Sequence, residues 1–501
     1  MKKIVYLPLD ERPCNYYFPL AQLCDNEQYH LVVCPKYSMG DKKKPADFHK
    51  ISSFLLSECL DADALVISID TLLYGGIVPS RLHNLTEQEL EQRLSLIDIL
   101  KKNNAHIKIF AFSLIMRCPQ YSSDDEEPTY YQDCGKEIFK RGEILHKIEL
   151  NIVTKEEQNH LQYLIDKTNY CIDDYLSRRK INLSMNLNAV AKVGKSIDFL
   201  VLPQDDSSVY GYIVKDQTAV KRAVELSECC DNIFVYPGAD EVGMMLVARF
   251  INKDKGVSLS YFVEYSSSLG GECIPLYEDR EMSQTLRLQI LCSGGKIAVS
   301  KDKADIMLYV NSPSTDLINP NMLVTNDIIS KRQIEPFIED MTADIINGRQ
   351  VAIADTAYCN GGDTQLVKLL EKRGLLMRVT AYSGWNTSSN TIGTTVATSA
   401  LFYHFGATRS LTKFLALRYF EDIGYCAYTR KYLCDNFIRT LGLNYFNSGE
   451  REGVVSRKVE ETITQYMSQV TPSLTEKYKI TKCYLPWIRM FEVGLEIDEK
   501  N

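Results

Sequence analysis

The chain has 501 residues, more than a single hydrophobic core usually holds, so we expect two or three domains. Apolar residues make up 45% of the chain and charged residues 24%, a balance that argues against intrinsic disorder. The formal net charge of -8 argues against a nucleic-acid partner, because a nucleic-acid-binding surface needs clustered Lys and Arg.

The cysteines and the N-terminus predict a cytoplasmic protein. The 15 cysteines are scattered and odd in number, which does not fit a disulfide framework and is typical of a reducing compartment. The apolar run Ile4–Leu9 is too short for a signal peptide and is followed directly by charged residues. No stretch approaches the roughly 20 apolar residues of a membrane span, so we expect no membrane association.

Ten short apolar runs, rich in β-branched residues, occur in the first 390 residues. Runs that are apolar on both faces are typical of strands buried on both sides, and the amphipathic segments between most of them predict parallel βαβ units. The expected strands are Lys3–Leu9, His30–Pro35, Ala64–Asp70, Ile107–Leu114, Phe199–Pro203, Ile233–Pro237, Ser258–Glu264, Ile306–Asn311, Val351–Asp355 and Met377–Tyr382.

One helix expected between the third and fourth runs has a clear start signal. Thr86 followed by Glu89 matches a capping box, and Leu90, Leu94, Ile97 and Leu100 then fall on one apolar face.

These patterns predict an α/β protein with three regions. Residues 1–255 are expected to form a TIM-barrel-like or open parallel-sheet α/β domain, with a helical insertion at 118–196. Residues 256–400 are expected to form a second, smaller α/β domain, and residues 401–501 a helical C-terminal region. The polar, glycine-ended segment Asn252–Gly256 is the expected junction, and one distorted barrel with extra strands is the alternative.

Six of the ten runs are followed at once by a dense polar group. Ligands of parallel α/β proteins bind beyond the carboxyl ends of the strands, so we expect these groups to converge on one rim. For any single aspartate the alternative is a helix N-cap. The groups are Asp10–Arg12, Asp70–Gly76, Gln204–Ser207, Gly238–Glu241, Asp355–Asp363 and Gly384–Thr387.

Two successive expected strands, Phe199–Pro203 and Ile233–Pro237, are each followed by a pair of adjacent acids, which can divide the roles of ionised group and proton donor. The segment Tyr236–Val242 resembles a strand end of the family 20 β-hexosaminidases, which implies that Asp240 orients the substrate's acetamido group and Glu241 is the acid/base. Asp205–Asp206 resembles the aspartate pair of the family 84 N-acetylglucosaminidases, which implies that Asp205 orients the acetamido group and Asp206 is the acid. Both resemblances cannot describe one active site, so all four acids are candidate catalytic residues.

Further polar residues at these strand ends are candidates for substrate binding. Acids, amides and tyrosine hydroxyls can bind sugar hydroxyls, arginine can grip an anionic group, and a tryptophan ring can stack on a sugar. Buried ion pairs and tight turns are the alternatives for several of them. The candidates are Asp10, Glu11, Arg12, Asp70, Tyr74, Arg117, Asn360, Asp363, Trp385 and Asn386.

Several kinds of site are absent from the sequence. The seven histidines are dispersed without zinc-ligand spacing, and no Walker loop, dinucleotide fingerprint or Gly-x-Ser-x-Gly elbow occurs. We therefore expect no cofactor and assign no metal ligand, although an oxygen-ligated Mg²⁺ or Mn²⁺ stays open because carboxylates are plentiful.

The six polar segments taken together resemble a bacterial family of conserved proteins of unknown function, about 500 residues long. The resemblance covers most of the chain, implies no activity, and supports treating the segments as one set. The function we expect is a glycoside hydrolase acting on a small, N-acetylated amino-sugar glycoside. The alternatives are a carboxylate–metal-dependent hydrolase or lyase and a non-catalytic protein that binds a sugar or nucleotide. An oligomer contact through the aromatic C-terminal region is left open.

Overall fold

A computed structural model describes residues 1–313 and 332–500, which divide into two compact units. The first unit contains residues 1–11, 28–243 and 277–279, and the second contains residues 12–27, 244–276 and those from 280 onward. The units are therefore interleaved in the sequence. The predicted domain boundaries at residues 255 and 400 stay predictions.

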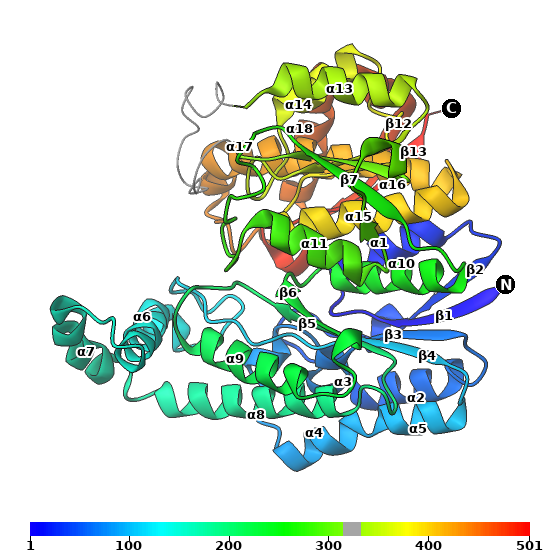
Figure 1. Cartoon of the computed structure of the whole chain (residues 1–501). Helices are drawn as coiled ribbons and strands as arrows, with labels where there is room; N and C mark the ends of the chain where they lie inside the picture. Colours follow the sequence, from blue (N-terminus) through cyan, green and yellow to red (C-terminus); the bar gives the residue numbers. More distant parts are fainter. Residues whose placement is uncertain (314–331, 501) are drawn as a thin grey trace. The chain divides into compact units, whose positions relative to one another are not determined.

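The first unit is built on a six-stranded parallel sheet with the strand order β2-β1-β3-β4-β5-β6 (Figure 1). The register places Val5 of the first strand beside Val32 on one side and Leu65 on the other. The strands are β1 (Lys2–Leu7), β2 (Tyr29–Val33), β3 (Ala64–Ser68), β4 (Lys108–Phe112), β5 (Phe199–Gln204) and β6 (Ile233–Pro237).

The predicted α/β class is confirmed, and the sheet is open. β2 and β6 are its edges, and no pairing joins them in this part of the structure, all of which is described. A TIM barrel closes with eight tilted and staggered strands, and this sheet has six. Of the two architectures expected for the N-terminal half, the open parallel sheet is therefore the one observed.

Most helices of the first unit lie on one face of this sheet (Figure 1). A right-handed crossover that moves towards β6 always places its helix on the same face, which accounts for α2, α4, α5, α8 and α9. The helices are α2 (Phe48–Glu58), α3 (Ile69–Tyr74), α4 (Glu87–Leu94), α5 (Leu96–Asn103), α6 (Tyr131–Glu149), α7 (Lys155–Thr168), α8 (Ile172–Ala191) and α9 (Tyr212–Glu225), with short 3-10 turns η1 (Lys36–Ser38), η2 (Pro79–Arg81) and η3 (Cys230–Asn232).

The predicted capping box at α4 is confirmed. The Thr86 hydroxyl accepts the Glu89 N–H, and the Glu89 carboxylate accepts the Thr86 N–H at 2.8 Å. The helix pauses at Ser95 and continues as α5, and the four apolar residues predicted for one face, from Leu90 to Leu100, are all buried.

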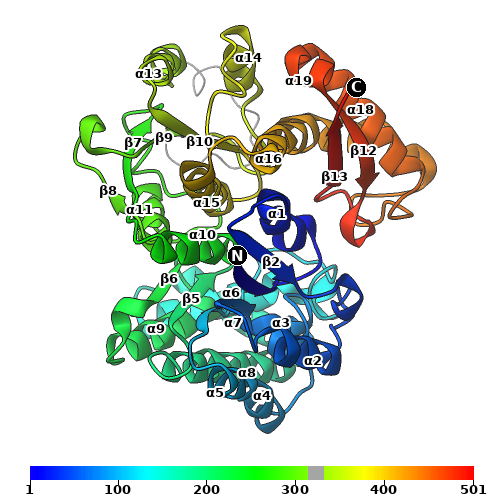
Figure 2. The ribbon, with the colours of Figure 1, turned by 90° about the vertical axis from the view of Figure 1, so that its right-hand side faces the viewer.

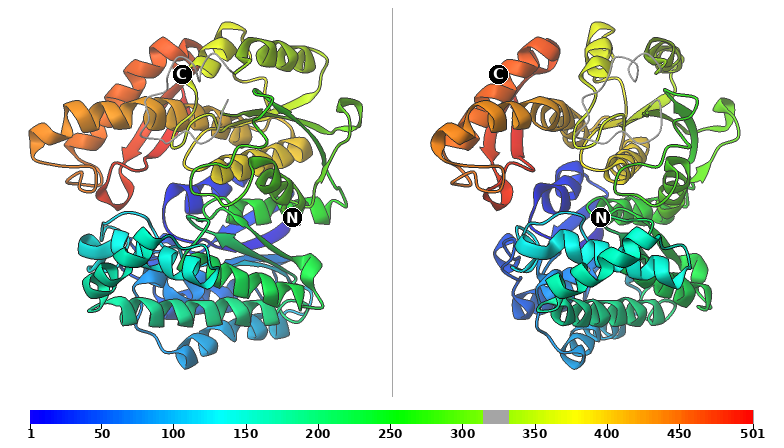
Figure 3. Two further views of the ribbon diagram at one scale, coloured as in Figure 1. Left: turned by 60° about the vertical axis from the view of Figure 1, so that its left-hand side comes forward. Right: turned by 90° about the vertical axis from the view of Figure 1, so that its left-hand side faces the viewer.

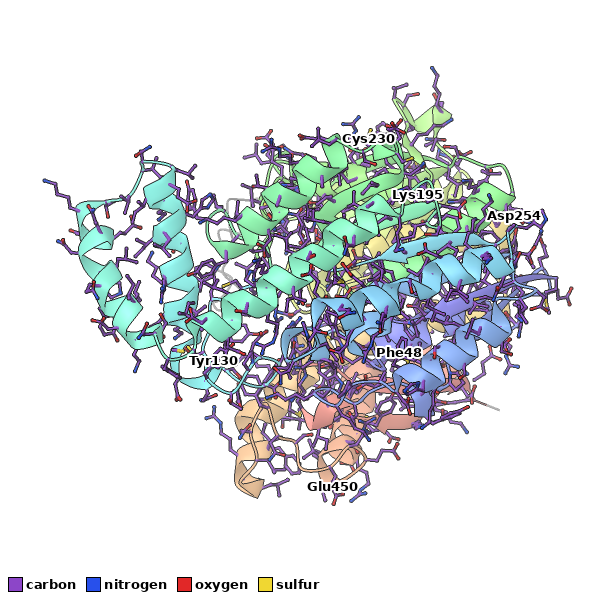
Figure 4. The ribbon with its side chains drawn as sticks, turned by 90° about the horizontal axis from the view of Figure 1, so that it is seen from below. Phe48, Tyr130, Lys195, Cys230, Asp254 and Glu450 are labelled. Carbon is purple, nitrogen blue, oxygen red and sulfur yellow. The ribbon has the colours of Figure 1, made fainter. Side chains whose placement is uncertain are left out.

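The helical insertion predicted between residues 118 and 196 contains α6, α7 and α8. α6 and α7 form a hairpin that projects from the body of the first unit, and α8 returns the chain to β5 (Figure 4). Tyr130, labelled in Figure 4, marks the base of this hairpin.

The second unit is built on a five-stranded parallel sheet with the order β11-β10-β9-β7-β8. Read from β8, the order is β8-β7-β9-β10-β11, in which the strands follow the same pattern as β2-β1-β3-β4-β5 of the first sheet. Both are doubly wound sheets whose order reverses after the first strand. The strands are β7 (Ser260–Tyr265), β8 (Lys296–Ile297), β9 (Ile306–Asn311), β10 (Gln350–Asp355) and β11 (Ala381–Ser383).

Helices cover both faces of the second sheet, with α13 and α14 on one face and α11 and α15 on the other (Figure 2). The helices grouped with this unit in whole or in large part are α1 (Pro13–Leu23), α10 (Val242–Asp254), α11 (Met282–Cys292), α13 (Ile334–Ile346), α14 (Thr364–Lys372) and α15 (Ser388–Phe405), together with the 3-10 turn η4 (Lys301–Lys303).

The C-terminal region is helical, as predicted, and also contains an antiparallel hairpin that was not expected. β12 packs on α18 and β13 on α16 (Figure 3). Polar residues such as Lys479, Thr481 and Lys482 along β12 hide the strand pattern. The elements are α16 (Arg409–Tyr419), the π-helix η5 (Phe420–Thr429), α17 (Arg430–Asn436), η6 (Ile438–Leu441), α18 (Val454–Val470), α19 (Pro472–Lys477), β12 (Tyr478–Tyr484), η7 (Pro486–Ile488) and β13 (Gly494–Glu499).

Within residues 1–313 and 332–500, no helix has both the length and the apolar character needed to cross a bilayer.

Gly75 ends α3 in a conformation that only glycine adopts easily, with φ of +90°, and a Cβ there would lie 2.6 Å from the Ala46 nitrogen. We expect Gly75→Ala to destabilise the protein by more than the ~1 kcal/mol of left-handed strain alone. The matched control is Gly374→Ala, because Gly374 has φ of +65° and nothing within 4 Å of the added Cβ. Thermal unfolding of both variants measures the difference, and equal midpoints would contradict this packing at Gly75.

Candidate active site

The order of the first sheet reverses between β1 and β3, the position where doubly wound proteins bind ligands beyond the strand ends. Asp10 and Glu11 follow β1, and Asp70 follows β3. The Asp70 carboxylate is buried and accepts the Leu114 N–H at 2.9 Å, which links the ends of β3 and β4. Burial raises the pKa of Asp70 to about 7.

A network of two arginines and four carboxylates lies beyond the ends of β3, β4 and β5, and we name it the acid–arginine cluster. The sequence had singled out three members, of which Arg117 was a binding candidate and the two aspartates were catalytic candidates. Three loops supply the six side chains: the loop after β3 supplies Arg81, the loop between β4 and α6 supplies Arg117, Glu126 and Glu127, and the loop after β5 supplies Asp205 and Asp206.

Arg81 joins two of these loops. Its Nη2 lies 2.8 Å from Oδ2 of Asp205, and its Nη1 lies 2.9 Å from Oε2 of Glu126. The Arg81 side chain is 2% exposed, so its charge depends on these carboxylates rather than on water.

Arg117 makes a parallel set of contacts. Its Nη1 lies 3.0 Å from Oδ2 of Asp206, and its Nε lies 2.8 Å from Oε1 of Glu127. The second oxygen of Glu127, Oε2, is buried and has no hydrogen-bond partner among the described residues. It is an acceptor that a ligand hydroxyl or a water molecule can satisfy.

Asp206 is the most accessible carboxylate that bonds an arginine of the cluster. Its side chain is 22% exposed, compared with 15% for Asp205. Its backbone has φ of +44°, a left-handed conformation uncommon outside glycine and often found at functional sites. Burial, and next the charge of Asp205, raises the pKa of Asp206 to about 6 against the opposing effect of Arg117 and Arg81.

The second acid pair, Asp240–Glu241, follows β6 and lies in a tight loop. Glu241 is fully buried, and its Oε2 accepts the Ala239 N–H at 3.0 Å. A Cβ at Gly238, whose φ is +147°, would lie 2.0 Å from the Glu241 Oε1. Burial raises the pKa of Glu241 to about 8, with smaller contributions from the negative charges of Asp240 and Glu278.

Three other predicted binding residues occupy separate places. The Tyr74 ring stacks on His83 with ring centroids 4.6 Å apart. Glu11 Oε1 accepts the Lys42 N–H at 3.0 Å. Asp10 and Glu11 belong to the first unit, but Arg12 belongs to the second. There its guanidinium carbon lies 4.6 Å from the Trp487 ring centroid.

The second sheet carries its own polar cluster beyond β9 and β10. Asp355 is fully buried and accepts hydrogen bonds from Asn311 Nδ2 at 2.8 Å, the Tyr382 hydroxyl at 2.8 Å and the Asp363 N–H at 2.6 Å. Arg332 Nη1 lies 2.7 Å from Oδ2 of Asp363. Burial raises the pKa of Asp355 to about 7, and the charge of Asp363 adds to the rise.

The loops after β10 and β11 meet through their backbones. The Asn360 N–H donates to the Asn386 carbonyl at 2.8 Å, and both residues have positive φ. The π-helix holds both loops, because Asp422 accepts the Gly384 N–H with its carboxylate at 2.7 Å and the Gly362 N–H with its carbonyl at 3.1 Å. A π-helical segment of this kind often marks a functional region.

Trp385 is half-buried, whereas the sequence suggested an exposed stacking platform. Its Nε1–H donates to the Thr394 hydroxyl at 3.2 Å, and its ring packs edge-to-face with Phe18 at 5.8 Å. The Arg418 guanidinium carbon also lies 6.0 Å from the centroid of the Trp385 ring, and these contacts together reduce the area left for stacking.

The six predicted segments are divided between the two units. Asp70, Arg117 and the Asp205–Asp206 pair come together in the first unit, and Asn360, Asp363, Trp385 and Asn386 lie in the second. Sequence reasoning missed several partners. Glu126, Glu127 and Arg81 were not singled out, because none of them directly follows an expected strand.

Across the described residues, no group of three or more His, Cys, Asp or Glu side chains has a geometry that could hold a metal ion. In the acid–arginine cluster, guanidinium groups take the positions opposite the carboxylates. The metal-dependent alternative stays a prediction.

A family model described as a protein of unknown function, DUF4127, matches residues 4–496. The chain belongs to the DUF4127 family. This membership confirms the predicted resemblance to a family of unknown function and covers nearly the whole chain. No curated protein matches the sequence. The hexosaminidase resemblances stay predictions.

Glu241 allows a direct test of the buried acids. A carboxyl whose pKa rises from 4.5 to about 8 on folding binds more protons when folded, so its contribution to stability falls as pH rises through this range. Glu241→Gln keeps an acceptor for the Ala239 N–H and cannot ionise. For wild type, this group lowers the free energy of unfolding by about 1.4 kcal/mol per pH unit between the two pKa values, and we expect the variant to lack this decline.

Thermal unfolding between pH 5 and pH 8 measures the effect of Glu241→Gln. The wild-type midpoint should fall relative to that of the variant as pH rises. A constant difference between the two midpoints would contradict the raised pKa of Glu241.

Proposed function

We propose that the protein is a glycoside hydrolase whose catalytic pair is Asp205 and Asp206, acting on a small N-acetylated amino-sugar glycoside. The observation that carries the proposal is the difference between two adjacent carboxyls. Each carboxylate forms an ion pair, Asp205 with Arg81 and Asp206 with Arg117, but burial, and next the charge of Asp205, raises the pKa of Asp206 to about 6. Adjacent acids in unlike environments suit a division between ionised group and proton donor.

Accessibility favours this pair over Asp240–Glu241. A general acid must reach the leaving-group oxygen of the substrate. Asp205 and Asp206 keep 15% and 22% of their side-chain surface exposed, whereas Glu241 has none and its carboxylate folds back on its own loop. Glu241 is therefore assigned a structural role in this proposal.

The remaining residues of the acid–arginine cluster would set the geometry. Arg117 bonds both Asp206 and Glu127, so it fixes the position of the proton donor. In the proposed reaction Asp206 gives its proton to the glycosidic oxygen as the bond to the anomeric carbon breaks. Asp205 orients the acetamido group, whose carbonyl oxygen attacks that carbon.

Asp206→Asn removes the proposed proton donor and keeps the shape of the side chain. We expect turnover of N-acetyl glycosides with poorly activated leaving groups, such as phenyl, to fall by at least ~100-fold. The loss should be smaller for nitrophenyl leaving groups, which need less help from an acid. Steady-state kinetics on the two substrate classes measure the contrast.

The matched control is Glu241→Gln, an equally conservative change in the other acid pair. We expect it to keep turnover within a few-fold of wild type. A large loss in Glu241→Gln together with an intact Asp206→Asn would transfer the acid role to Glu241. Full activity in both variants would contradict the glycosidase proposal.

The pH profile gives an independent test. An acid catalyst acts only while protonated, so kcat/KM should fall as pH rises through about 6, the value to which the pKa of Asp206 is raised. Initial rates from pH 4.5 to pH 8.5 measure this limb. A rate that is flat or rising across that range would exclude Asp206 as the acid.

A further inference from the structure

Two cysteines meet at the base of the α6–α7 hairpin. Sγ of Cys134 lies 3.4 Å from Sγ of Cys171, and the two residues are 37 positions apart in sequence. Both side chains are buried in an apolar cluster that also contains Met116, Cys118 and Tyr131.

The local backbone accounts for this approach. Cys134 leaves the helical conformation inside α6, with φ of -143° and ψ of 20°, and Cys171 stands just before α8 begins. Each thiol also bonds a carbonyl of the preceding turn, Cys134 to Tyr130 at 3.1 Å and Cys171 to Thr168 at 3.3 Å. The two sulfurs therefore face each other from the two ends of the hairpin.

We propose that Cys134 and Cys171 form a thiol–disulfide site that is oxidised by a low-molecular-weight disulfide of the glutathione type. One thiol, as thiolate, attacks the small disulfide and releases one glutathione thiolate. The second protein thiolate then attacks the mixed disulfide, forms the Cys134–Cys171 bond and releases the second glutathione. Two protein thiols are oxidised, one small disulfide is reduced to two thiols, and the two protons pass to the glutathione thiolates.

The covalent bond would close the hairpin at its base. A disulfide needs its sulfurs about 2.05 Å apart, so the two sulfurs have to move by only about 1.3 Å. The loop then encloses most of α6 and all of α7 (Figure 4). Cross-linking residues this far apart restricts the unfolded chain and stabilises the folded hairpin.

The rate of oxidation depends on how often a thiolate forms. Burial raises the pKa of Cys171 to about 12, and the neighbouring Cys134 adds to this rise. The pair therefore reacts slowly at neutral pH and faster as pH increases. The proposal does not depend on the glycosidase assignment, because it concerns no residue of the acid–arginine cluster.

The test is to incubate the folded wild-type protein with oxidised glutathione at pH 8.5, block the remaining thiols by alkylation, and map the tryptic peptides. Cleavage after Arg117, Lys136, Lys167 and Arg178 gives the peptides 118–136 and 168–178. We expect these two peptides to be joined, with a mass about 2 Da below the sum of peptide 118–136 alkylated at Cys118 and unmodified peptide 168–178. Thermal unfolding of the oxidised protein should occur at a higher temperature than that of the reduced protein.

Variants identify the sulfur involved, because peptide 118–136 contains both Cys118 and Cys134. Cys118→Ser is the matched control from the same apolar cluster, and it should still give the joined peptides. Cys134→Ser and Cys171→Ser should each abolish them and the shift in unfolding temperature.

Three results would overturn the proposal. In the first, both peptides stay separate and alkylated while the exposed Cys24 and Cys230 become glutathionylated. In the second, the joined peptides appear only when the protein is oxidised in denaturant. In the third, Cys118→Ser, rather than Cys134→Ser, abolishes the bond.

Discussion

Two buried guanidinium groups organise the loops at the carboxyl edge of the first sheet. Arg81 and Arg117 come from the loops after β3 and β4, and they bond carboxylates from the loop after β5 and from the acidic loop that precedes α6. A buried charge without a partner costs several kcal/mol, so each arginine requires the carboxylates and each carboxylate requires an arginine. This mutual requirement holds together the three loops that follow β3, β4 and β5.

The same physical principle recurs in the second unit with different side chains. Its sheet has the strand order of the first five strands of the first sheet, and a polar cluster again follows the central strands. There Asp355 accepts three hydrogen bonds, and Arg332 pairs with Asp363. The π-helix adds a support that the first unit lacks, because Asp422 holds the backbone of two glycines in neighbouring loops. Each doubly wound sheet thus has a hydrogen-bonded polar cluster of its own beyond its strand ends.

Sequence patterns predicted the strands well because strands buried on both faces are apolar along their whole length. All ten expected strands are present within a few residues of their predicted ends. β8 has only two residues and carries no pattern, and the polar residues of β12 hide its buried face. The closure of the sheet was not predictable, since an open sheet and a barrel use the same βαβ units.

The acids of the candidate site could be predicted from the sequence, but the side chains that pair with them could not. Acids at strand ends could be read directly, so Asp70, Asp205 and Asp206 were found. Pairing between Arg81 and Asp205 spans 124 residues, and no local pattern reports it. The sequence also does not report how deeply each strand-end acid is buried, and this burial distinguishes the accessible Asp206 from the enclosed Glu241.

The central claim is that this buried network holds Asp206 as a proton donor. The most direct measurement is a ¹³C NMR titration of aspartate carboxyl carbons, with the Asp206 signal assigned by its loss in Asp206→Asn. We predict a midpoint near pH 6, as the raised pKa of Asp206 requires. A midpoint at or below pH 4, the value of an ordinary exposed aspartate, would contradict the claim.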